Sequence, residues 1–407
     1  MHKVTNAILK SNRGRDPERL AMKLAAIRQD PFSFFRGTCP LFYSTLQLDR
    51  SLLSSPSVLA CGDLHLENFA SYKGDNRLVY FDVNDFDEGC VAPVSFDLVR
   101  FLASVLVAAK PLKLRDNAAM KIVDAFLDTY ASNIADTKPR WMERSLATGP
   151  VRTLLRAVKG RHRADLIAER TTQKSGKRRL KIDGVKALAV SSKERARAES
   201  ILAAYASIQP SPSFFEPIDI ARRIAGNGSL GLERYVVLVR GADKNDGQYL
   251  VDIKFTGTSA LAGFTGVAQP RWKSEAERAS TIQRIAQAIP PALLGSVGMG
   301  GRSYLIKELE PSADRLDLAK LREKSGALVD VVRRMAELTA WAHLRSCGRL
   351  GAGTVEELAA FVARDKWRQL VTDCARASAA LSIEQWQHYA ADYDADPHHL
   401  LAAVGSK

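Results

Sequence analysis

A block of β-strand patterns between residues 216 and 310 interrupts a chain that otherwise has mainly helical periodicity. Within this block, RRIAGNGSLGLERYVVLVRG and YLVDIKF flank the turn ADKNDGQ and predict a β-hairpin, and RSYLIKELE (302–310) predicts another strand. Apolar residues recur at helical spacing in RGRDPERLAMKLAAIRQ and in residues 96–135, 273–289 and 317–346. This separation of strand-rich and helix-rich segments predicts an α+β fold.

The length of 407 residues exceeds the size at which a single hydrophobic core usually stops growing. The Pro/Ser-rich stretch QPSPSFFEP (209–217) is typical of a segment boundary. We expect an N-terminal helical segment (1–56), a segment with two polar motifs and a basic stretch (57–210), a β-rich segment (211–312) and a helical C-terminal segment (313–407).

Most of the net charge of +14 comes from residues 151–200, which hold 15 Lys and Arg but only 5 Asp and Glu. This stretch has few aromatic residues to stack on bases, so nucleic-acid binding is not expected. It is either a solvated charged surface or a site for phosphate or an acidic substrate.

Several features predict a cytoplasmic protein. The longest apolar stretches are too short to cross a bilayer, so no membrane span is expected. The N-terminus lacks the long apolar region of a signal peptide. The five cysteines are scattered and form no C-x-x-C pair, which predicts reduced, mostly structural thiols.

Two polar clusters follow predicted strands, at CGDLHLENF (61–69) and about twenty residues later at NDFDE (84–88). Phosphoryl transfer from ATP needs an Asp to orient the acceptor hydroxyl, and an Asn and an Asp to hold magnesium. Asp63, Asn68 and Asp85 supply this set, and the D-x-x-x-x-N spacing equals that of kinase catalytic loops.

The sequence GNGSLG (226–231) matches G-x-G-x-x-G, a pattern that is weak evidence when it stands alone. A strand follows it, whereas a Rossmann loop opens a helix. A glycine-rich loop between strands can instead cover nucleotide phosphates and needs a lysine on the next strand. Lys254, flanked by apolar residues in YLVDIKF, is the candidate, and its ammonium requires a partner or a ligand. The alternative is an edge-strand lysine that reaches water.

GDLHLEN and NDFDEGCVAPVSFDL resemble the motifs of aminoglycoside phosphotransferases and choline kinases, a branch of the protein-kinase-like superfamily. That pattern runs roughly H-G-D-x-H-x-x-N, then I-D-F-D-D, then D-x-A-x-D-L. The stretches PFSFFRGT, CGDLHLENF, VYFDVNDFDE and SFDLVRFLAS together resemble the bacterial domain-of-unknown-function family 2252, over most of the chain.

The kinase resemblance implies ATP and Mg²⁺ as cofactors and assigns roles to individual positions. It implies Asp63 as catalytic base, Asn68 and Asp85 as metal ligands, Lys254 as the phosphate-contacting lysine and Asp97 as a brace for the catalytic loop. The implied nucleotide contacts are Gly226, Asn227, Gly228, Ser229 and Gly231 over the phosphates, with Lys307, Glu308 and Leu309 in the hinge to the adenine.

Two features depart from the kinase pattern. Cys61 stands where the catalytic-loop His is usual, and the catalytic loop precedes the glycine-rich loop instead of following it. The order predicts a circular permutation of a two-lobe kinase-like fold. The expected lobes are a mostly helical large lobe and a small antiparallel β lobe with one helix.

Several roles stay open between alternatives. Glu275, Glu277 or Gln283 is expected to pair with Lys254. His65 fits a loop-bracing hydrogen bond better than metal ligation, and Arg36 fits a salt bridge to the acidic cluster better than a substrate contact. Asp87 is either a second metal contact or an exposed carboxylate, and Asp82 competes with Asp85 as metal ligand.

The leading prediction is an ATP- and Mg²⁺-dependent phosphotransferase with an unidentified acceptor, which the basic stretch suggests is anionic. A close alternative keeps the fold but transfers AMP, or binds nucleotide without turnover. More remote alternatives are a metallophosphoesterase, because GDLH resembles the G-D-x-H of those hydrolases, and a basic nucleic-acid-binding protein.

Overall fold

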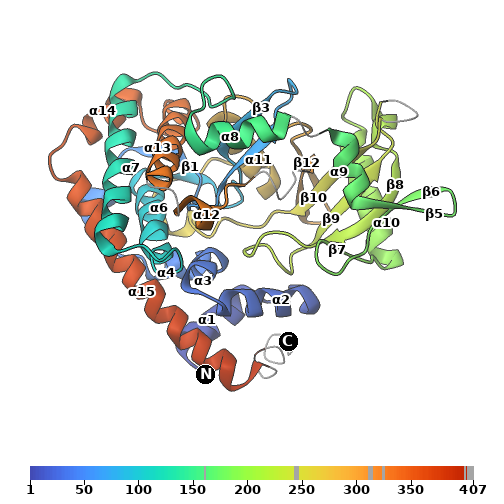
Figure 1. Ribbon diagram of the computed structural model, residues 1–407, viewed down its shortest axis with the longest axis horizontal. Helices are drawn as coiled ribbons and strands as arrows, with labels where there is room; N and C mark the ends of the chain where they lie inside the picture. Colours follow the sequence, from blue (N-terminus) through green and yellow to red (C-terminus); the bar gives the residue numbers. More distant parts are fainter. Residues whose placement is uncertain (160–161, 243–246, 310–314, 323–325, 398–399, 401–407) are drawn as a thin grey trace.

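A computed structural model describes residues 1–159, 162–242, 247–309, 315–322, 326–397 and 400 (Figure 1). The helices are α1 (Lys3–Ser11), α2 (Pro17–Arg28), α3 (Pro31–Gly37), α4 (Cys39–Thr45), α5 (Arg50–Leu53), α6 (Ser95–Ala108), α7 (Asp116–Asp136), α8 (Gly149–Lys159), α9 (Arg163–Arg170), α10 (Ser192–Ala206), α11 (Glu275–Ala286), α12 (Leu318–Arg322), α13 (Ala327–Ser346), α14 (Val355–Val362) and α15 (Trp367–Ala395). The strands are β1 (Ser57–Ala60), β2 (Phe69–Lys73), β3 (Val79–Val83), β4 (Cys90–Pro93), β5 (Thr171–Lys174), β6 (Lys177–Leu180), β7 (Ala187–Leu188), β8 (Pro217–Arg223), β9 (Arg234–Val239), β10 (Tyr249–Phe255), β11 (Gly295–Met299) and β12 (Arg302–Glu308). The predicted α+β class is confirmed.

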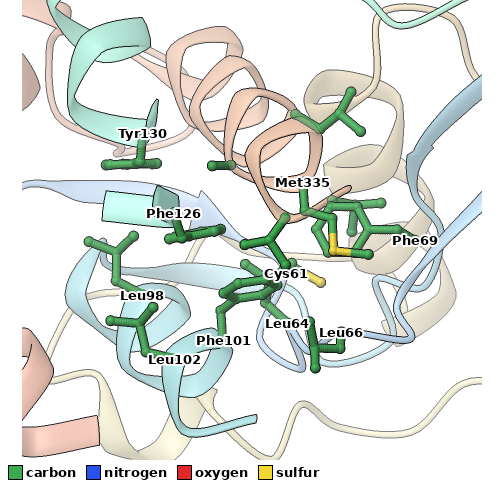
Figure 2. Close-up of a cluster of buried hydrophobic side chains, with 14 of the residues drawn as sticks. Cys61, Leu64, Leu66, Phe69, Leu98, Phe101, Leu102, Phe126, Tyr130 and Met335 are labelled. Atoms are coloured by element: carbon green, nitrogen blue, oxygen red, sulfur yellow. The ribbon is translucent and has the colours of Figure 1, made fainter. Parts of the chain in front are cut away.

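Helices α6, α7, α13 and α15 build the main core, in the part of the molecule that we call the large lobe (Figure 1). Helix α6 is apolar on almost every side, and all its residues except Leu106 are buried. A helix with apolar residues all round is stable only when other elements surround it. Figure 2 shows its Leu98, Phe101 and Leu102 packed near Phe126 and Met335. This core supports the connections that carry the two polar motifs.

The small lobe is a six-stranded antiparallel sheet in the order β11-β12-β10-β9-β8-β7. Both faces of its middle are covered. Val237 and Val239 of β9 pack with α10, whereas Val236 and Leu238 pack with Ile167 of α9. Because alternate side chains point to opposite faces, a strand buried on both sides has a continuous apolar run. This accounts for the sequence YVVLV.

The boundary expected at residue 210, between the segment with the polar motifs and the β-rich segment, lies too far toward the C-terminus. Residues 163–206 belong with the small lobe, because β7 joins its sheet and α9 and α10 cover its two faces. The small lobe therefore holds more than the one helix expected. The stretch 209–217 is not a free linker either, since Phe215 is buried in the cluster with α10. The helix expected at 317–346 is present as α12 and α13, and residues 323–325 between them lie outside the described residues.

Two short two-stranded sheets carry the polar motifs. Strand β1 pairs with β4, and β2 pairs with β3, both antiparallel. The sequence predicted β1 and β3 but not their partners. Residues 61–68 connect β1 to β2, and residues 84–89 connect β3 to β4, so this pairing brings the two connections together. Among the described residues, no helix combines the length and apolar character needed to cross a membrane.

Candidate functional site

Asn68 and Asp97 hold the two polar connections in place. The Asn68 side-chain amide donates to the carbonyls of Asp63 and Asp85, both at 3.0 Å, and its Oδ1 accepts from the Asp85 N–H at 2.9 Å. Asp97, fully buried in α6, accepts the N–H groups of Cys61 at 2.7 Å and Gly62 at 2.9 Å. Both ends of the Asn68 amide are thus used in bracing. The metal-ligand role that the resemblance implies for Asn68 stays a prediction.

Asp63 lies beside a buried arginine that the sequence analysis did not single out. Arg100 of α6 has no exposed surface, and its Nη2 and Nε donate to Asp63 Oδ1 at 2.8 and 3.1 Å. The guanidinium lies over the rings of Phe35 and Phe42. Burial raises the pKa of Asp63, and Arg100 opposes that rise. The other carboxylate oxygen of Asp63, Oδ2, faces His65 and lies 4.0 Å from its Nε2.

Lys254 of β10 reaches across from the small lobe to the second polar connection. Its Nζ lies 2.9 Å from Asp85 Oδ2 and 2.5 Å from Asp87 Oδ2, and the side chain is 7% exposed. Partial desolvation raises the pKa of Asp85, but the ammonium more than offsets this and holds that pKa below its usual range. Burial and the charge of Asp85 raise the pKa of Asp87. The predicted need of Lys254 for a partner is met by these two aspartates.

The expected pairing of Lys254 with helix α11 is wrong. Glu277 lies in the first turn, where its carboxylate accepts the Lys273 N–H at 2.6 Å. Glu275 pairs with Arg278 at 2.6 Å. A carboxylate in the first turn is stabilised locally by the unsatisfied N–H groups there, and this interaction competes with a distant lysine. Gln283, the third option, is buried but makes no hydrogen bond to Lys254.

These groups surround one pocket between the lobes, which we call the Asp63 pocket. Its charged lining consists of the carboxylates Asp63, Glu67, Asp85, Asp87 and Glu88 and the cations Arg15, Lys23, Arg36, Lys254 and Arg315. Residues 226–229 of the glycine-rich loop also line it. Segments that are far apart in the sequence, 63–88 and 226–254, therefore meet at one site.

The N-terminal helices hold the glycine-rich loop through its carbonyl groups. Arg15 donates to the carbonyls of Gly228 and Leu230, both at 2.7 Å, and Lys23 donates to that of Gly228 at 3.0 Å. Among the described residues, none accepts a hydrogen bond from the N–H groups of residues 227–229. Unpaired amides on such a loop can bind an anion. Gly231 instead packs on Arg15, outside the Asp63 pocket.

The expected hinge residues do not act as a group. Lys307 lines a neighbouring pocket, whereas Glu308 pairs with Arg77 and Leu309 is buried in the cluster beside α9. The N–H of Glu308 donates to the Ala292 carbonyl and that of Leu309 to the Leu250 carbonyl. Neither N–H is free to bind a base, so the structure does not support the hinge role of Glu308 and Leu309.

The remaining predicted residues lie in or near the pocket. His65 accepts the Glu67 N–H on Nδ1 at 3.1 Å, and burial together with Arg36 lowers its pKa well below the usual value, which keeps the ring neutral. Arg36 forms a salt bridge of 2.6 Å with Glu67. Asp82 is buried outside the Asp63 pocket, so the geometry favours Asp85 over Asp82 as a pocket carboxylate.

Asp85 and Asp87 supply the oxygen atoms on which binding of Mg²⁺ at this site would depend. Asp87 Oδ1 is buried without a hydrogen-bond partner, and Asp85 Oδ2 and Asp87 Oδ2 converge on the Lys254 ammonium. In the described part of the chain, no group of three or more His, Cys, Asp or Glu residues is arranged to hold a metal. Mg²⁺ is often held by one or two carboxylates together with substrate phosphates. Asp85 and Asp87 fit that kind of site.

Glu88, Arg15 and Lys23 were missed by the sequence analysis. Burial raises the pKa of Glu88 to about 7, and its carboxylate accepts the N–H of Ala260. Burial and Arg15 lower the pKa of Lys23 well below the usual value. Glu88 follows the predicted metal aspartates directly, which was an available signal. Nothing local in the sequence connects Arg15 and Lys23 to a loop about 200 residues away.

A second pocket adjoins the first at Lys254 and Asp85; we call it the Lys307 pocket. Its charged lining comprises the cations Arg170, Lys186, Arg223, Arg234, Lys254, Lys307 and Arg315 and the carboxylates Glu67, Asp85 and Asp252. Residues of the basic stretch thus reach this site. Counted over the residues that the structure describes, the Asp63 pocket has balanced charges, whereas the Lys307 pocket has a clear cationic excess.

The fold and the site together define a two-lobe α+β protein with a mixed-charge pocket between its lobes. Residues 15–392 match the model of the family described as "Uncharacterized protein conserved in bacteria (DUF2252)", and the chain belongs to that family. This confirms that part of the resemblance. Neither the curated proteins nor the solved structures contain a match to the chain.

Proposed function

We propose that this protein is an ATP- and Mg²⁺-dependent phosphotransferase of kinase-like type. The observation that carries the proposal is the meeting of Asp63, Asp85, Lys254 and the glycine-rich loop at one pocket. These are the parts that phosphoryl transfer requires: a carboxylate at the acceptor, oxygen ligands for a metal, and a cation and amides for phosphate. The motif resemblance assigns the same residues to these tasks.

Each protein group has a defined task in this proposal. Asp63 Oδ2 accepts the proton of the acceptor hydroxyl, while Arg100 holds Oδ1 and fixes the orientation of the carboxylate. The N–H groups of residues 227–229 and the Lys254 ammonium bind phosphate oxygens. Asp85 and Asp87 would hold Mg²⁺, which supplies neutralisation of the phosphate charge. Lys254 then exchanges its carboxylate partners for phosphate.

The proposed fold is a circularly permuted kinase-like one. The strand-rich small lobe comes after the loops that carry Asp63 and Asp85. Helices α1 and α15 lie side by side, and Thr5 Oγ1 and the His2 N–H both donate to Asp392, at 2.6 Å (Figure 1). A permuted order requires elements that are distant in the sequence to pack together, and this contact meets that requirement.

The test is label transfer from ATP by the full-length protein. Bacterial extract supplies acceptors, and hydrolysis of ATP in its absence reports transfer to water. With Mg²⁺ and γ-labelled ATP we expect label to move, and Asp63→Asn or Asp85→Asn to lower the rate at least about 100-fold. Asp75→Asn, at an exposed turn, is the matched control. An unchanged rate in Asp63→Asn or Asp85→Asn would show that the role assigned to that residue is wrong.

The same assay separates the close alternatives. If label moves from α-labelled ATP in place of γ-labelled ATP, the protein transfers AMP and the proposed phosphoryl transfer is wrong. If neither label moves to any acceptor while ATP still binds, the protein is a nucleotide-binding module. The Asp63 pocket is common to these outcomes, and only the reaction differs.

A further inference from the structure

The Lys307 pocket has features of a prepared anion site. Among the described residues, its lining carries seven cationic side chains against three carboxylates. The charges come from several elements: Arg170 from α9, Arg234 from β9, Lys254 from β10 and Lys307 from β12. Convergence of cations from separate elements costs repulsion in the folded state, so a bound anion would stabilise the arrangement.

Ion pairs fix part of this lining. Asp252 is 2% exposed and accepts from Arg234 at both oxygens, at 3.0 and 2.5 Å, and it also pairs with Arg223. A two-point contact of this kind holds a guanidinium in one orientation. Gln283 of α11 is 1% exposed and lines the pocket, and its Nε2 has no hydrogen-bond partner among the described residues. A buried donor without a partner is costly unless a ligand satisfies it.

The same pocket is poorly suited to a nucleotide base. Its apolar lining in the described part of the chain consists of Ala70, Ile224, Ala225 and Leu305, without an aromatic ring. In the sheet register, Lys254 stands opposite Arg234 and Leu305, and Asp252 stands opposite Lys307. Charged residues thus occupy the sheet where a flat apolar slot for a purine would have to lie.

We propose that the Lys307 pocket binds a polyphosphate chain, one end of which reaches Lys254 at the border with the Asp63 pocket. Phosphate oxygens match the guanidinium and ammonium donors of the lining. The choice of polyphosphate over another anion rests on the proposed function, which places phosphates at Lys254. The chain belongs either to a nucleoside triphosphate or to an inorganic polyphosphate.

The experiment is calorimetric titration of the full-length protein with inorganic tripolyphosphate. We expect binding that falls at least tenfold in the Lys307→Gln/Arg170→Gln double variant. The matched control is Arg13→Gln/Lys193→Gln, which removes two charges from a different basic groove beside α10. Circular dichroism and thermal melting establish that each variant is folded. Equal tripolyphosphate affinity in the pocket variant and the control would overturn the proposal.

Competition identifies the source of the phosphates. ATP that displaces tripolyphosphate, while adenosine does not, assigns the site to the phosphates of a nucleotide. Tripolyphosphate binding that ATP leaves unchanged assigns it to inorganic polyphosphate. Displacement of tripolyphosphate by adenosine alone would show that the pocket accepts the base, contrary to the proposal.

Failure of this inference can be distinguished from failure of the proposed function. The titration needs no turnover, so it reports tripolyphosphate binding whether or not label moves from ATP. Tripolyphosphate binding without label transfer would support the anion site and contradict the proposed phosphotransferase. Label transfer together with an unchanged tripolyphosphate affinity in the Lys307→Gln/Arg170→Gln variant would support the phosphotransferase and contradict the anion site.

Discussion

Several charged residues in this protein are buried at positions where loss of hydration costs free energy. Arg100 lies in the middle of an apolar helix with no exposed surface, and its charge is balanced by Asp63 and by two aromatic faces. The single Arg of LVRFLAS, within an otherwise apolar run, is the signal for this arrangement in the sequence. A buried cation needs a partner, and that requirement alone directs attention to a nearby carboxylate.

Replacement of Arg100 tests its role as a positioning residue. Arg100→Lys keeps the charge but loses the two-point contact with Asp63 and the stacking on Phe35 and Phe42. We expect the free energy of unfolding to fall by about 2–4 kcal/mol, as for other disrupted buried pairs. We also expect kcat for label transfer to fall at least about tenfold with little change in KM for ATP. Arg368→Lys, on a half-exposed surface pair, is the control. Normal kcat in a destabilised Arg100→Lys variant would limit Arg100 to a structural role.

Glu88 should make stability depend on pH. Its pKa of about 7 in the folded protein lies above its ordinary value of 4.5 because of burial. Between those pH values the folded state binds more protons than the unfolded state, so stability falls as the pH rises and then levels off above about 7. Glu88→Gln removes this loss while keeping an oxygen for the Ala260 N–H.

The measurement is urea unfolding of the unaltered protein and Glu88→Gln from pH 4.5 to pH 8. We expect the variant to be more stable at pH 8 by about 1–3 kcal/mol, at 1.36 kcal/mol per pKa unit with allowance for solvent in the pocket. The gap should close toward pH 4.5. A gap that is constant over this range would mean that Glu88 has an ordinary pKa.

At the scale of elements, the glycine-rich loop depends on glycine for two different reasons. Gly226 has a φ of +73°, a left-handed backbone conformation that residues other than glycine rarely adopt. Gly228 has no such conformation, and an added Cβ would lie 3.5 Å from the Arg36 carbonyl, an ordinary contact. The backbone therefore requires glycine at position 226. At position 228, which lines the Asp63 pocket, it would also accept a residue with a side chain.

Alanine substitutions separate these two reasons. Gly226→Ala should lower the free energy of unfolding by about 1–2 kcal/mol, the cost of a left-handed residue. Gly228→Ala should change it by less than about 0.5 kcal/mol but weaken ATP binding, because a methyl group hinders the approach of phosphate to the amides. Chemical denaturation and ATP titration of both variants provide the comparison. Equal destabilisation by the two substitutions would contradict this account of the loop.

At the scale of the whole molecule, the sequence predicted some features and not others for physical reasons. The α+β class and most helices follow from periodicity, which local sequence carries. The pairing of Lys254 with Asp85 could not be predicted in this way, because Asp85 lies 169 residues away in the sequence. Glu277, the expected partner, instead accepts the N–H of the nearby Lys273. The attachment of the basic stretch to the small lobe was also missed, because a few buried residues, such as Ile167 and Leu180, are surrounded by many charges.

The most direct test of the central claim is a crystal structure with Mn²⁺ and a non-hydrolysable ATP analogue, in which anomalous scattering locates the metal. We predict Mn²⁺ bound to the carboxylates of Asp85 and Asp87, with the polyphosphate in contact with Lys254. The metal should be lost in Asp85→Asn. An analogue bound elsewhere on the protein, or no metal at these carboxylates when the analogue is bound, would contradict the proposed phosphotransferase site.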